Sequence, residues 1–62
     1  MNEFIGKRIR IEKGAIAHEG VLVGRAGYDA IGRDGEKFRM WVLSTNVGEV
    51  HFTGDHWRFS PL

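Results

Sequence analysis

The chain has 62 residues, with nine Lys and Arg against eight Asp and Glu, a formal charge of +1 and no cysteine. These numbers exclude a disulfide framework, a thiolate metal site and a strongly cationic nucleic-acid-binding domain. Without an internal repeat, residues 1–62 form one domain, which buries only about 60% of the surface of the unfolded chain. We therefore expect a small core that either suffices alone or is extended by homo-oligomerisation.

The first half of the chain is predicted to form two strands joined by a loop. Residues 5–12 place isoleucines on one side and mostly arginines on the other, which is the period of two of a half-buried strand. Gly14 and Gly20 bracket a predicted loop. The apolar run of residues 21–23 then forms a second strand.

The second half is predicted to contain shorter extended segments separated by turns. Residues 28–31 form a third strand, followed by an Asp-Gly pair at 34–35 that supplies the positive φ of a tight hairpin turn. Residues 36–43 alternate clearly as a fourth strand, and residues 49–52 as a fifth. A last extended piece covers residues 57–59, and no segment has a convincing helical pattern.

Five or six short antiparallel strands with nine glycines predict an all-β fold, a single small barrel rather than a flat sandwich. Curling the strands on themselves hides most of their edges, and glycines allow the sheet to bend. The alternation predicts a core of Ile5, Ile9, Ile11, Val21, Val23, Ile31, Phe38, Met40, Val42, Val50, Phe52 and Trp57.

The strand, loop and strand that carry Ile9, Ile11, Gly14, Gly20 and Val21 resemble the KOW motif of SH3-like barrels. This motif occurs in ribosomal proteins and transcription elongation factors, where the loop and the adjacent strand faces contact RNA or protein. The resemblance covers about a third of the chain and implies an SH3-like barrel.

A second resemblance is to the plasmid-borne type II dihydrofolate reductases, SH3-like barrels that act as homotetramers around a central pore. It is carried by Gly6, Arg8, Ile9, Arg10, Gly14, Ala15, Gly20 and Val23. The Val-Gln-Ile-Tyr run that lines the pore in that family is matched here by residues 50–53, which keep only the valine. The resemblance therefore implies shared architecture, with the reductase kept as a remote alternative.

No residue pattern predicts catalysis or a bound cofactor. His18, His51 and His56 lack a recognisable metal-ligand spacing, and Ser44 and Ser60 lack the setting of a nucleophile. We therefore expect no catalytic residue, no metal and no cofactor. With no apolar run near the roughly 20 residues of a membrane span and no signal-type stretch, we also expect a cytoplasmic, unprocessed protein without membrane contact.

The predicted solvent faces suggest a binding surface. Arginines of the first strand and basic residues beside a tryptophan of the fourth strand lie opposite the apolar positions, so guanidinium groups can neutralise phosphates while the indole stacks on a base. The candidate residues are Arg8, Arg10, Lys37, Arg39, Trp41 and Arg58. Nucleic acid or a nucleoprotein assembly is the leading partner. The alternative is a protein-interaction or self-assembling barrel with Trp41 in the interface.

Overall fold

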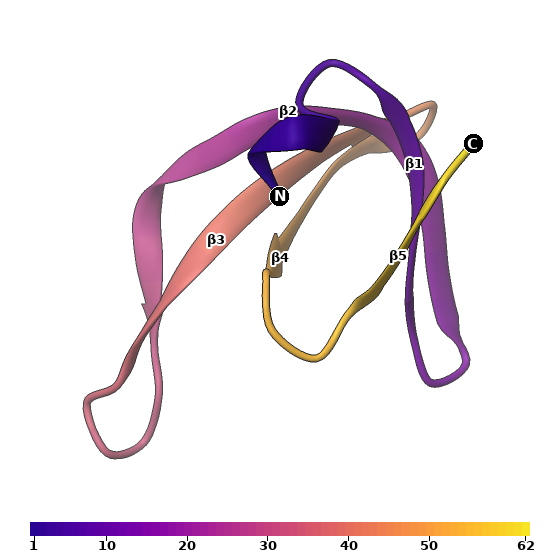
Figure 1. Cartoon of the computed structure of the whole chain (residues 1–62). Coiled ribbons are helices and arrows are strands. Elements are labelled where there is room, and N and C mark those ends of the chain that lie inside the picture. The colour runs from indigo at the N-terminus through magenta and orange to yellow at the C-terminus, as the bar shows by residue number, and fades with distance from the viewer.

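The computed structural model describes residues 1–62 and contains one five-stranded antiparallel sheet in the order β4-β3-β2-β1-β5 (Figure 1). The elements are a 3₁₀ turn η1 (Asn2–Phe4), β1 (Arg8–Lys13), β2 (Ile16–Ile31), β3 (Lys37–Thr45), β4 (Gly48–Thr53) and β5 (Arg58–Pro61). The all-β prediction is confirmed. No helix here has the length and apolar character needed to cross a membrane.

The β1–β2 hairpin is tighter than the sequence predicted. Lys13 pairs with Ile16, so only Gly14 and Ala15 form the turn. Gly14 has a φ of 60° and Ala15 a negative φ, which is the pattern of a type II′ hairpin turn. The predicted loop up to Gly20 is therefore wrong, because these residues already belong to β2.

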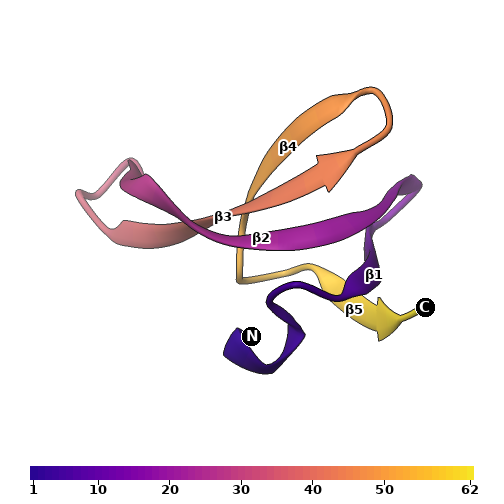
Figure 2. The same cartoon turned by 90° about the horizontal axis from the view of Figure 1, so that it is seen from above.

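β2 is a single long strand that replaces the two strands predicted at residues 21–23 and 28–31. Its register with β3 shifts between Leu22 and Gly24 and again between Arg25 and Asp29. Such irregularities bend a strand and increase its twist. The bend lets the first part of β2 pair with β1 while most of its length pairs with β3, and Figure 2 shows β2 extending between the two halves of the sheet.

The remaining hairpins agree with the sequence. At the β2–β3 turn Gly35 has a φ of 83°, and the Gly32 amide donates to the Glu36 carbonyl at 2.7 Å. At the β3–β4 turn the Thr45 hydroxyl donates to the Gly48 carbonyl at 2.7 Å. The β2–β3 hairpin projects from the body of the molecule (Figure 1). The Cα radius of gyration is accordingly 11.5 Å, slightly above the about 10.6 Å typical of this chain length.

The core is small and comes from four strands. Its buried cluster consists of Ile9, Ile11, Leu22, Trp41, Leu43 and Phe52. Side chains from both ends of the chain, including Phe4 and Phe59, pack against this cluster. Of the predicted core residues, Ile5, Val23 and Ile31 are exposed at 45%, 54% and 71%.

β3 packs a different face against the core cluster from the one predicted, although the predicted core residue Val42 is also buried, at 8% exposure. Trp41 and Leu43 point into the core, which we call the inner face, and Met40 and Val42 lie on the outer face. Over residues 40–43 both faces of this strand are apolar, so alternation alone could not select the face that packs in the core cluster. Trp41 is placed inward because it pairs directly with Phe52 of β4 and packs in the same cluster.

Candidate binding groove

The largest concavity of the molecule is a groove of about 480 Å³ between η1, β3 and the β4–β5 loop. Half of its ten lining residues are hydrophobic. The groove is lined by Met1, Glu3, Phe4, Lys37, Phe38, Arg39, Trp41, Gly54, Asp55 and Phe59. Its volume lies within the range of small-ligand pockets, about 300–1,000 Å³.

Trp41 forms part of the groove wall. Its side chain belongs to the core, but its indole Nε1 faces Gly54, where a Cβ would come within 3.1 Å of that nitrogen. The indole N–H makes no hydrogen bond within the chain. Every fully buried side-chain nitrogen of the molecule has a hydrogen-bond partner. The indole nitrogen has none, so it is not fully buried, and its N–H can donate to a ligand.

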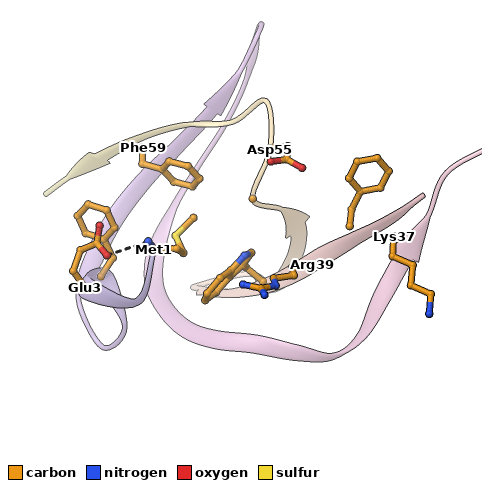
Figure 3. A pocket seen from close by; sticks show the side chains of 10 residues that line it. Met1, Glu3, Lys37, Arg39, Asp55 and Phe59 are labelled. Atoms are coloured by element: carbon orange, nitrogen blue, oxygen red, sulfur yellow. Dashed lines mark hydrogen bonds and ion pairs between the residues drawn. The ribbon is translucent and has the colours of Figure 1, made fainter. Parts of the chain in front are cut away.

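Two basic residues line the groove without carboxylate partners. Lys37 and Arg39 are both exposed, and neither takes part in an ion pair. Figure 3 shows Lys37 at one end of the groove, Met1 and Glu3 at the other, and Arg39 between them. Their charges are therefore available to a ligand.

Of the two acidic residues in the groove, Glu3 has an ion-pair partner and Asp55 has none. Glu3 forms an ion pair of 3.0 Å with the amino group of Met1. A hydrogen bond from its own backbone and that ion pair hold the pKa of Glu3 below its ordinary value. Asp55 lies in the β4–β5 loop, across the groove from Arg39 in Figure 3, and makes no ion pair. The groove thus combines cations, an unpaired carboxylate and aromatic walls.

The structure divides the six predicted binding residues between two faces. Lys37, Arg39 and Trp41 line the groove, whereas Arg8 and Arg10 alternate with the buried Ile9 and so lie on the outer face. The two arginines of β1 therefore do not join the Trp41 side of the sheet as predicted.

The outer-face arginines also have different neighbours. Arg10 contacts Glu19 at 2.8 Å and Glu12 at 3.5 Å, and the hydrogen bond to Glu19 is the main cause that raises its pKa. Arg58 of β5 is exposed and lies opposite Glu12 on β1. Arg8 borders a smaller, wholly polar hollow of about 200 Å³ with Glu19 and residues 44–46.

The prediction that Trp41 faces solvent is wrong, because this residue is only 5% exposed. Its burial occurs within the chain itself, against Phe52 and the isoleucines of β1. Trp41 therefore can neither stack on a base across its full face nor fill an interface with another molecule. Only its edge reaches the groove.

Several groove residues were not recognised from the sequence. Phe4 and Glu3 belong to a three-residue 3₁₀ turn, which is too short to give a periodic pattern. Asp55 belongs to the loop between β4 and β5, where His56 adopts a positive φ of 70°. The Thr-Gly-Asp sequence at residues 53–55 indicated a chain break there, but not its position beside β3.

The three histidines take separate positions. His18 lies near Trp57, with ring centroids 6.4 Å apart. His51 lies between Tyr28 and Glu49, its Nδ1 2.5 Å from the Tyr28 hydroxyl and its Nε2 3.3 Å from Glu49 Oε1. Nowhere do three or more His, Asp or Glu side chains gather in a group that could hold a metal ion.

No family model matches the chain, and no curated protein or solved structure is significantly similar to it.

Proposed function

We propose that this chain is a non-enzymatic binding module of the SH3-like barrel type that takes single-stranded nucleic acid in its groove. The observation that carries the proposal is the pair of unpartnered cations, Lys37 and Arg39, beside aromatic groove walls. Exposed cations next to aromatic rings are the two components of single-strand binding, since the cations neutralise phosphates and the rings stack on bases.

The composition of the groove favours a single strand over a duplex. Aromatic side chains can stack on a base only when that base is free of its own neighbours. Phe38 and Phe59 are half-buried at the groove and retain accessible ring surface. Asp55 and the Trp41 indole N–H supply an acceptor and a donor for the edges of a base.

Oligonucleotide titration tests the proposal. A Trp57→Phe background leaves Trp41 as the only tryptophan, and its fluorescence is followed with single- and double-stranded oligonucleotides at low salt. We expect salt-sensitive binding in the micromolar range, tighter for the single strand. Arg39→Gln should weaken it several-fold and lower the salt slope by about 1.

Arg58→Gln is the matched control, because it removes the same charge from the outer face. Its affinity should equal that of the parent. Absence of salt-sensitive binding would contradict the proposal, and so would an equal loss for the Arg39 and Arg58 variants, which would indicate diffuse charge attraction.

A further inference from the structure

The two edges of the sheet are unequal. β5 has only four residues, includes Pro61, which has no backbone N–H to donate, and carries Arg58. Proline, charge and short length are the usual means of preventing edge-to-edge pairing. β4 has six residues and contains neither Pro nor a basic Lys or Arg. It pairs only with β3, and Figure 2 shows it outermost in the sheet.

The polar side chains of β4, a carboxylate and an imidazole, are complementary to one another in an antiparallel arrangement. Glu49 and His51 share the outer face, because His51 pairs with Val42 and the intervening position points inward. If a second β4 runs antiparallel with Val50 opposite Val50, each Glu49 lies opposite His51 of the other copy. The twofold axis repeats this pair, so both polar positions meet an opposite group.

Neighbouring contacts fit the same register. The His51 ring is held by Tyr28 at its Nδ1, while its Nε2 lies 3.3 Å from Glu49 of the same chain, so this nitrogen is directed along the β4 face. Val47, at the β3–β4 turn, is 90% exposed. Pairing about Val50 places it beside Thr53 of the second copy and removes part of this apolar surface from water.

We propose that β4 pairs with β4 of a second copy of this chain, antiparallel about Val50, to form one continuous sheet. The argument uses the β4 edge alone and is independent of the groove. Contact through a single edge strand falls at the small end of protein interfaces, below about 1,200 Å², so we expect a dissociation constant on the order of micromolar.

Charge reversal followed by mixing tests the interface. Glu49→Lys places lysine opposite histidine, and His51→Glu places two carboxylates opposite each other, so each variant alone should sediment as a monomer where the wild type is a dimer. In a heterodimer of the two variants every pair again places a carboxylate opposite a lysine or histidine donor. An equimolar mixture should therefore recover the dimer. Because the two substitutions are on separate chains, mixing can restore contacts between chains but not contacts within one chain.

Arg58→Glu, a charge reversal on the other edge, is the control and should sediment as the wild type does. Circular dichroism establishes that each variant is folded. A monomeric wild type throughout the micromolar range would overturn the proposal, as would a mixture that stays monomeric or an Arg58→Glu variant that dissociates equally.

Cross-linking gives a second measurement that needs no charge change. The chain has no cysteine, and the two Val50 Cα atoms in the proposed register would lie about 4.5–5.5 Å apart, within disulfide range. Val50→Cys should therefore form a covalent dimer under mild oxidation. Val47→Cys is far more exposed but has no symmetric partner, so preferential cross-linking at position 47 would contradict the register.

Discussion

Gly20 lies within β2, opposite the buried Ile9, where the backbone of β3 passes close by. A Cβ at this position would come within 2.2 Å of the Ser44 carbonyl oxygen, which is backbone and cannot rotate away. Gly20→Ala should therefore lower the free energy of unfolding by about 2–3 kcal/mol. Urea denaturation followed by tryptophan fluorescence measures the loss.

Gly27→Ala is the matched substitution in the same strand. Gly27 does not have a positive φ, and a Cβ there meets no atom within 4 Å. The alanine should leave stability unchanged or raise it by about 0.4–1 kcal/mol, because it restricts the unfolded chain. Equal losses for both variants would show that packing against Ser44 is not the reason for glycine at position 20.

The contrast between these glycines shows a limit of sequence reasoning at this scale. Gly20 was interpreted as the end of a loop, because glycine often marks a turn. That interpretation holds for Gly14 and Gly35, whose positive φ values lie in tight turns. At Gly20 the cause is a tertiary contact with Ser44, far along the chain, and a single sequence gives no sign of it.

At the scale of elements, strands with one apolar face were predictable and β3 was not. β1 alternates isoleucines with charged residues, so its buried side follows directly from a period of two. β3 has Met40 and Val42 on one face and Trp41 and Leu43 on the other. Its inverted face turned Trp41 inward together with Lys37 and Arg39, so these three residues line the groove and Trp41 is only 5% exposed.

Asp34, in the β2–β3 turn, should make the free energy of unfolding depend on pH in the acid range. A hydrogen bond shared with the Glu36 carboxyl group and one donated by the Glu36 backbone amide, 3.3 Å from Asp34 Oδ1, hold the pKa of Asp34 below the ordinary 3.8. A carboxyl with a lower pKa in the folded state stabilises the fold above its unfolded pKa, and this contribution is lost as pH falls through the folded value. Below pH 3.8, wild-type stability should therefore decline more steeply than that of Asp34→Asn.

Urea midpoints at about pH 6 and about pH 2.5 measure the difference between the two proteins. Glu3, whose pKa is also lowered, is present in both and contributes equally to each decline. Parallel pH profiles for the wild type and Asp34→Asn would show that the Asp34 hydrogen bonds do not stabilise the turn.

For the whole molecule, a small core leaves much apolar surface outside. Only eight of the 62 residues are buried, and the accessible surface is 4433 Å², compared with about 4,000 Å² expected for a compact monomer of this mass. Length and composition predicted this weakness of the core. The surface that is covered on association could not be predicted, because the position of β4 at a free edge depends on the order of the strands in the sheet.

Association through β4 would couple thermal stability to protein concentration, since a dimer that dissociates on unfolding is favoured by mass action. For a chain of this length, the Tm of the wild type should fall by about 5 °C for each tenfold dilution while the dimer predominates. Glu49→Lys removes the complementary pairs, so its Tm should be lower and independent of concentration. Scanning calorimetry over a hundredfold range of concentration distinguishes the two proteins. A wild-type Tm that stays constant over that range would mean that the small core and the packed chain ends supply all of the stability, and that the open β4 edge remains unpaired.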